Sequence, residues 1–469
     1  MGRMRKAHAN PLGKHGLMLT DPQTRRPYAS FRRPLEISGV YTWFLVFLFL
    51  VPTFRGPLHV GGSYYGEMIQ AAYTGGFLVL LLALMAHRRL HKNLLVAPLY
   101  ICFAFCLLVC AAMLRDAHHM VPSDTLELYK PILALLIFTS SVLIRWDEDS
   151  VEKVFTAYLV ICGLMATYSI FEALGGTTIN SIASILYKDN KDVLTGKATG
   201  TFGVTYSFGA FMIFGCILSL SSFLYRKHIT SLFIFFFCTT SVILSQSRSS
   251  AIAMLFLVVA LFLTYWLYNN FKHKIVFYVG YITMVIVVII ALNSLLSVFD
   301  KLPYLYEGIK YLLEHGVSAQ GGGSFNQRYQ QILFAFREQS DFPLIGAGIG
   351  KGYARLLESY YALYLYRFGL VGISISIVIF ISFFYISLRA FNRSFKAGNL
   401  KGACFFLSLH FWMYAFPIIS LSSSLHDQGK FSVFFYGSFG IMISYVYREN
   451  LRNEYQSRVT KYKLEEEYI

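Results

Sequence analysis

The sequence contains little charge, since only 14% of its 469 residues are Asp, Glu, Lys or Arg. Soluble domains carry about 25% charged residues, so this chain has too few of them for an ordinary water-exposed surface. Instead, 56% of the residues are hydrophobic, and apolar runs recur at about the 20-residue length that crosses roughly 30 Å of hydrocarbon. The composition excludes a soluble enzyme, a disordered chain and a disulfide-rich secreted module. It predicts an all-α, polytopic integral membrane protein.

Cysteine is also scarce, and all seven cysteines fall inside apolar runs. Cys102, Cys106 and Cys110 are spaced so that they share one helix face, a pattern that could suggest metal ligation. No His or acidic residue accompanies them, so we interpret them as small packing residues. We expect neither a disulfide framework nor a metal site at this position.

The apolar runs define twelve candidate membrane spans. They cover approximately residues 38-53, 67-86, 94-114, 129-145, 153-172, 202-224, 231-246, 250-268, 275-297, 360-388, 403-421 and 431-447. Residues 1-36 carry eight Lys/Arg and no early apolar core. They are therefore expected to be a basic cytoplasmic tail on anionic headgroups rather than a signal peptide.

The distribution of positive charge predicts the orientation of the chain. With the N-terminus inside, 26 of the 41 Lys/Arg fall on the cytoplasmic side and 14 on the opposite side, and Arg367 sits within a span. Cytoplasmic loops are the ones enriched in Lys/Arg, so both termini, including residues 448-469, are expected in the cytoplasm. The net charge of +16 therefore reflects membrane topology, and no nucleic-acid partner is expected.

A long outer loop, residues 298-357, separates spans 1-9 (residues 37-297) from spans 10-12 (residues 358-447). It contains YLYEGIKYLLEHGV, a GGG break, SFNQRYQQILFAFREQSD with Ser324 as its expected N-cap, and FPLIGAGIGKG. Apolar residues recur at helical spacing on both sides of the break, which predicts amphipathic helices. Long ordered loops are usually functional.

Two arginines on the outer side are candidates for anion binding. Arg248 lies in the short SQSRSS hairpin. Inserting a charged side chain at membrane depth costs about 2.5–3.5 kcal/mol, so such a residue is usually paired with another group or has a function. It could face a cavity and hold an anion, or it could snorkel to the outer headgroups. Arg328 opens the second loop helix with Gln331 one turn later, and alone it is an ordinary solvated charge.

Glu358 begins ESYYALYLYRFGLVG at the mouth of span ten. It could be a first-turn acid that stabilises a helix N-terminus, or a general base at the membrane surface. The nearby GAGIGKG is not a Walker phosphate loop, because Ile345 and Gly352 stand where that pattern needs Gly and Ser/Thr. Nucleotide binding is therefore not expected.

Three stretches together resemble the O-antigen ligase and polymerase superfamily of bacterial envelope glycosyltransferases. The first two are KATGTFGVTYSFGAFMIF at 197-214 and SQSRSSAIAM at 245-254. The third is RYQQILFAFREQSDFPLIGAGIG at 328-350, followed by ESYYALYLYRFGLVG at 358-372. The resemblance spans about residues 195-375, and it rests on the order and spacing of the stretches.

The resemblance implies roles for these residues. In that superfamily the hairpin arginine and the arginine opening the second loop helix hold the donor's lipid diphosphate, which implies this role for Arg248 and Arg328. A guanidinium can bind phosphate oxygens in bidentate fashion and never loses its charge. The ligases carry a His at the start of the following helix, where this chain has Glu358-Ser359, and this departure favours a polymerase.

We therefore predict a polymerase that transfers a growing glycan from undecaprenyl diphosphate to a lipid-linked repeat unit, at the periplasmic face of the bacterial inner membrane. Glu358 would be the catalytic base of a metal-independent, inverting transfer that needs no cofactor, since no acidic cluster suited to a metal occurs on the outer side. Additional candidate substrate-binding residues are Lys197, Arg337, Tyr360 and His426.

The alternatives are a ligase acting on lipid A core, a twelve-span flippase or glycan transporter, and a non-enzymatic scaffold. The absence of an internal repeat between halves disfavours a transporter, and a scaffold leaves Arg248 without a clear use. Expected partners are the undecaprenyl-diphosphate-linked oligosaccharide, membrane lipids and a separate chain-length regulator. The sequence does not identify the sugars or the linkage.

Overall fold

The structure is a computed structural model. It describes residues 37–50, 59–60, 63–87, 92–115, 129–175, 179, 196–202, 204–268, 324–338, 343–349, 357–425 and 430–448.

The regular secondary structure of the described residues is helical apart from one short antiparallel strand pair, β1 (His59–Val60) and β2 (Ser63–Tyr64). The first helices are α1 (Ile37–Leu50), α2 (Tyr65–His87), α3 (Lys92–Arg115), α4 (Tyr129–Leu143) and α5 (Glu148–Leu174). The 3-10 turn η3 (Gly200–Phe202) then precedes α7 (Thr205–Arg226), α8 (Ile229–Leu244) and α9 (Arg248–Tyr268). The last helices are α12 (Ser324–Glu338), α13 (Tyr360–Lys396), α14 (Leu400–Ser420) and one over residues 430–448. The helical fold class is confirmed for this part of the chain.

The helices follow the predicted spans closely. Each predicted span except 275-297, which lies outside the described residues, coincides with a helix. Five described helices are long and apolar enough to cross a membrane, namely α5, α7, α9, α13 and α14. The protein is therefore an integral membrane protein by its helices, while the count of twelve spans stays a prediction.

One boundary differs from the hydropathy prediction for a local reason. The fifth span was expected from residue 153, but α5 begins at Glu148 because Asp147 caps it by accepting a 2.9 Å hydrogen bond from the Ser150 amide. Acids in the first turn also favour a helix N-terminus. The added turn is polar, so hydropathy alone does not detect it.

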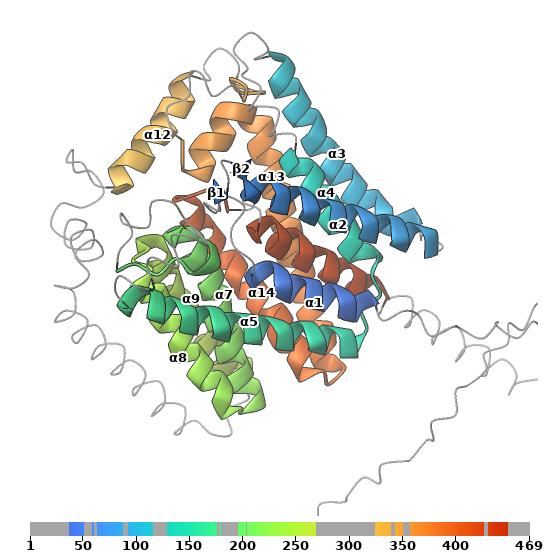
Figure 1. Cartoon of the computed structure of the whole chain (residues 1–469), viewed down its shortest axis with the longest axis vertical. Helices are drawn as coiled ribbons and strands as arrows, with labels where there is room; N and C mark the ends of the chain where they lie inside the picture. The colour runs from blue at the N-terminus through green and yellow to red at the C-terminus, as the bar shows by residue number, and fades with distance from the viewer. Residues whose placement is uncertain are drawn as a thin grey trace, which may run out of the picture.

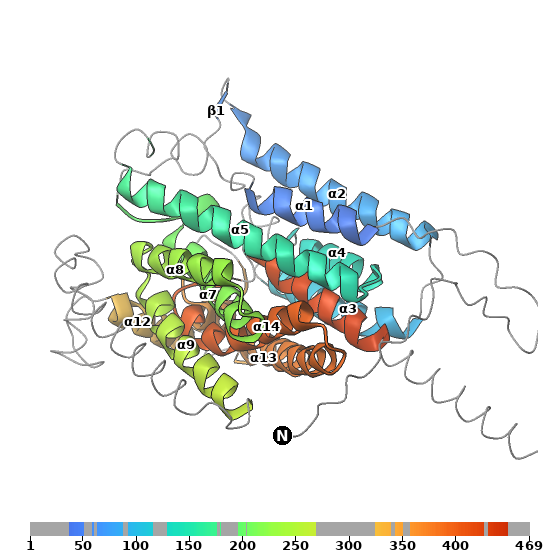
Figure 2. The same cartoon turned by 90° about the horizontal axis from the view of Figure 1, so that it is seen from below.

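The centre of the bundle is α7, which is buried along almost its whole length. A helix that is apolar on every side belongs in the interior. Figure 2 shows α1 and α2 on one side of the bundle and α13 on the other, with α5, α7 and α14 between them. In Figure 1, α12 lies at one end of the bundle, where it packs against α13.

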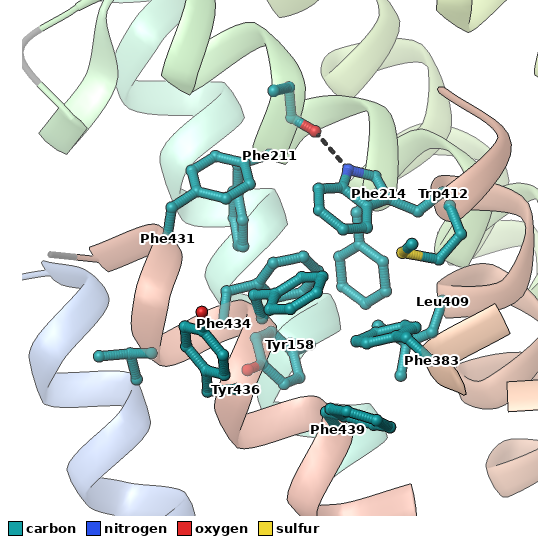
Figure 3. Close-up of a cluster of buried hydrophobic side chains, with 14 of the residues drawn as sticks. Tyr158, Phe211, Phe214, Phe383, Leu409, Trp412, Phe431, Phe434, Tyr436 and Phe439 are labelled. Carbon is teal, nitrogen blue, oxygen red and sulfur yellow. Dashed lines mark hydrogen bonds between the residues drawn. The ribbon is translucent and has the colours of Figure 1, made fainter. Parts of the chain in front are cut away.

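A cluster of aromatic side chains joins the central helices (Figure 3). Phe214 from α7 lies 4.8 Å from Phe434 of the last helix between ring centroids, and Tyr158 from α5 stacks on Phe405 at 5.7 Å. Trp412 from α14 donates its indole N–H to the carbonyl of Ala210 at 2.9 Å. Aromatic pairs contribute about 0.5–1.5 kcal/mol each beyond their buried area, so this cluster fixes how the core helices pack.

The outer helices keep large apolar side chains exposed. On α13 these include Ile377, Val378 and Ile381, and on α9 Ile252 and Phe256. An extended apolar exterior is unfavourable in water and is what a lipid-facing surface requires.

Candidate functional site

Two of the predicted site residues meet where α12 packs on the start of α13. The Arg328 guanidinium (Nη2) forms an ion pair with Oε2 of Glu358. Their side chains are 17% and 35% exposed, so the pair lies at the edge of the protein and stays accessible. The structure thus places the Arg328 cation and the Glu358 carboxylate side by side, although they are 30 residues apart in the sequence.

The second loop helix holds this position through apolar contacts as well. Ala335 on α12 is fully buried against the start of α13, in a small cluster that is separate from the main core. Phe334 stacks on Tyr366 with ring centroids 5.9 Å apart. The predicted helix after the glycine break is therefore present, and its apolar face binds α13. The first predicted loop helix lies outside the described residues.

The turn formed by residues 343–349 is held to α13 by hydrogen bonds between backbone groups. Gly369 interrupts α13 with φ 60° and ψ −156°, a conformation that is essentially restricted to glycine. The interruption removes helical hydrogen bonds, and the turn replaces them. These bonds are Ala347 N to Tyr366 O, Gly348 N to Arg367 O, Leu370 N to Pro343 O and Val371 N to Leu344 O.

The same contacts explain why GAGIG is not a phosphate cradle. A phosphate loop needs several backbone N–H groups pointing at the anion. Here the amides of Ala347 and Gly348 already donate within the protein, and the Gly346 carbonyl accepts from Arg115 at the end of α3. This turn is a structural anchor for the start of α13.

Arg248 is the first residue of α9 and is half-buried. The hairpin that carries it is packed tightly, since Ser247 Oγ lies 2.8 Å from Ser250 Oγ and Ser249 Oγ lies 2.8 Å from Ser422 Oγ. Ser422 belongs to the turn after α14. The hairpin is therefore fixed to the turn that follows α14.

Tyr206 lies near both that turn and the ion pair. It stands in the first turn of α7, beside the side chain of Ser423 and within electrostatic range of Glu358 and Arg328. The hairpin of Arg248 and the Arg328–Glu358 pair therefore lie in the same region of the protein as residues 422–423 and Tyr206. Tyr206 falls inside the family-like stretch at 197-214, but nothing in its residue type or position in the sequence indicated that it lies near the candidate site.

The stretch that contains Lys197 is bonded to the arginine hairpin. The amide of Ala198 donates to the Leu244 carbonyl at 2.9 Å, and the Gln246 side chain donates to Gly196 O at 3.4 Å. Gln246 adopts φ 55°, the left-handed conformation that a tight turn requires. Half-buried Lys197 thus lies beside the Arg248 hairpin.

Two buried ionisable residues that the sequence reasoning missed organise this stretch. Glu172, at the end of α5, is fully buried and accepts hydrogen bonds from the Thr199 amide at 2.7 Å, the Thr199 hydroxyl at 2.6 Å and the Gly200 amide at 2.8 Å. Lys430, 4% exposed, donates to the carbonyls of Thr201 at 2.8 Å and Phe49 at 3.3 Å. Ionisable residues inside or beside apolar runs are usually conspicuous, and this signal was available in the sequence.

The other predicted residues lie elsewhere. Arg337 is exposed at the far end of α12. Tyr360 is only 2% exposed and packs against Phe380 and Phe416 in the aromatic core. His426 lies outside the described residues. Within the described ranges, no three or more His, Cys, Asp or Glu gather as metal ligands would.

Comparison with known families agrees with the second and third of the three stretches, while the first, at 197-214, lies outside the matched region. A family model described as O-antigen ligase matches residues 233–375, which include the Arg248 hairpin, α12 and the start of α13. This match confirms the resemblance to the O-antigen ligase/polymerase superfamily over that region, which is less than half of the chain. No curated protein matches the chain.

Proposed function

We propose that this membrane protein, whose residues 233–375 carry an O-antigen ligase region, is a polysaccharide polymerase. Its donor would be a growing glycan on undecaprenyl diphosphate, and its acceptor a second lipid-linked repeat unit. The observation that carries the proposal is the ion pair of Arg328 with Glu358. It brings together a guanidinium of the kind that binds phosphate and a carboxylate that we propose as the proton acceptor.

In the proposed reaction, Arg248 and Arg328 bind the donor's diphosphate. An acceptor hydroxyl passes its proton to the Glu358 carboxylate as its oxygen attacks the anomeric carbon. The new glycosidic bond forms while the bond from that carbon to the phosphate oxygen breaks, and the diphosphate leaves with the electron pair. The arginines stabilise the charge that develops on the leaving group. Attack opposite the leaving group inverts the anomeric centre, and no metal takes part.

The ion pair leads us to expect that donor binding precedes proton transfer in this reaction. Oε2 of the Glu358 carboxylate is paired with the Arg328 guanidinium. A diphosphate carries more charge than a carboxylate and competes for the same guanidinium. We expect a bound donor to draw the Arg328 guanidinium toward its diphosphate and to leave the Glu358 carboxylate open to the acceptor hydroxyl.

The residues at 358 and 359 favour polymerisation over ligation. The ligases of the superfamily carry a His at the start of this helix, whereas this chain has Glu358 and Ser359. The site would face the periplasm from the inner membrane, with both termini cytoplasmic. A chain-length regulator is a proposed partner.

Two experiments test the proposal. Purified protein in lipid vesicles should convert lipid-linked repeat units into longer glycans and free undecaprenyl diphosphate. Failure to form glycosidic bonds, combined with translocation of the lipid-linked glycan, would instead indicate a flippase. In a deletion strain, single repeat units on lipid A core indicate a polymerase, whereas core without repeats indicates a ligase.

A further inference from the structure

Gln331 lies on α12 close to Arg328, and its side chain reaches the residues that precede α13. Its Oε1 accepts hydrogen bonds from the amide of Glu358 at 3.1 Å and from the amide of Ser359 at 3.2 Å. These two amides flank the α-carbon of Glu358. One side-chain oxygen therefore restrains both backbone torsions of that residue.

The start of α13 does not provide this restraint itself. Ser359 occupies the N-cap position with φ −61° and ψ 131°, but its side chain makes no capping hydrogen bond. An N-cap serine normally accepts a bond from an amide in the first turn. Here the entry to the helix is fixed from another helix, by Gln331.

Residues three or four apart on a helix lie on the same face, so Arg328 and Gln331 both face the start of α13. Arg328 holds the carboxylate of Glu358, and Gln331 holds its backbone. We infer that Gln331 is a positioning residue that sets Glu358 against the arginine and the acceptor. This inference rests on the proposed function, because Gln331 acts through Glu358.

The first test replaces Gln331 by methionine, which has a similar length and no oxygen acceptor. Gln331→Met should lower kcat about 10–100-fold, since a misplacement of about 1 Å at a reacting group can cost 10²-fold. The donor KM should change less than about threefold, because Arg248 and Arg328 remain. The control is Gln330→Met on the same helix, whose exposed side chain contacts Asn326 at 3.4 Å, and it should leave both constants unchanged.

A double-mutant cycle separates positioning from a structural role. In a Glu358→Gln protein, Gln331→Met should lower the residual rate less than about twofold, because residues that act as one unit are not additive. Independent, multiplicative losses would overturn the inference. A Gln331→Met protein that is as active as Gln330→Met would also overturn the inference. A Gln331→Met protein that size exclusion and thermal unfolding show to be misfolded would overturn it as well. An inactive wild-type protein would instead contradict the proposed function, and the inference with it.

Discussion

Arg328 and Glu358 form an ion pair across the contact between α12 and α13, and both side chains stay partly accessible. A solvent-screened ion pair contributes only about 0–1 kcal/mol to stability, and the partial exposure of this pair leaves it open to the substrate we propose. We therefore expect substrate to displace either member of the pair without unfolding the protein.

The two arginines should be essential for activity. Arg248→Ala and Arg328→Ala should each abolish polymer formed from lipid-linked repeat units, while the protein remains in the membrane. Lysine at either position should restore little activity, because a point charge lacks the bidentate fork of arginine. The matched control is Arg389→Ala, an exposed arginine of α13 that packs over the Tyr385 ring at 4.5 Å. Full activity of Arg248→Lys would identify that arginine as a snorkelling charge.

Replacing the carboxylate of Glu358 should separate binding from chemistry. Glu358→Gln removes the proton acceptor and should lower the rate about 10²–10⁴-fold. Donor binding should be at least as tight as in the wild type, because Arg328 no longer has a competing carboxylate. The measurements are turnover and, separately, equilibrium binding of the lipid-linked donor.

The exposed acid Glu338, at the end of α12, provides the control variant Glu338→Gln, which should behave as wild type. If Glu358 only stabilises a helix terminus, its replacement costs at most about 0.3–1 kcal/mol of stability and keeps activity. Near-normal turnover would therefore exclude the base role, and His426 and Asp427 would be the next candidates.

The interruption of α13 should tolerate only glycine. A Cβ at Gly369 would lie 2.5 Å from the Gly346 nitrogen and 2.7 Å from the Leu344 carbonyl, and both are backbone atoms that cannot rotate away. Gly369→Ala should therefore lower the free energy of unfolding in detergent by more than the roughly 1–3 kcal/mol expected from backbone strain alone. A thermal unfolding measurement would show this loss. Gly398→Ala is the control, because Gly398 has φ +78° with nothing within 4 Å of the added atom. Equal losses in the two variants would show that the contact with the turn contributes nothing.

The orientation of the chain can be tested by thiol labelling. In a cysteine-free protein, cysteines introduced at residues 310-325 should react with an impermeant reagent added to cells with a permeabilised outer membrane. Cysteines at residues 393-400 should be protected, because positive charge places that loop inside. The opposite pattern would reverse the predicted topology.

The sequence predicted the helices well because hydropathy responds to local composition. It placed Arg328 and Gln331 on one helix face, since that follows from residue spacing alone. It could not bring Glu358 to Arg328, because this contact depends on the path of the chain between α12 and α13. It likewise missed the break at Gly369, since a glycine in an apolar run changes hydropathy little.

The hydrogen bonds between α13 and the turn at residues 343–348 affect how the protein is made. Around Gly369, the backbone groups of Tyr366, Arg367, Leu370 and Val371 hydrogen-bond to that turn. A helix inserted into lipid with such groups unsatisfied loses several kcal/mol for each one. The turn precedes α13 along the chain and is synthesised first. We therefore expect insertion of this helix to be coupled to docking of the turn, and we expect the helix alone to lose its kinked shape if it were transplanted into another membrane protein.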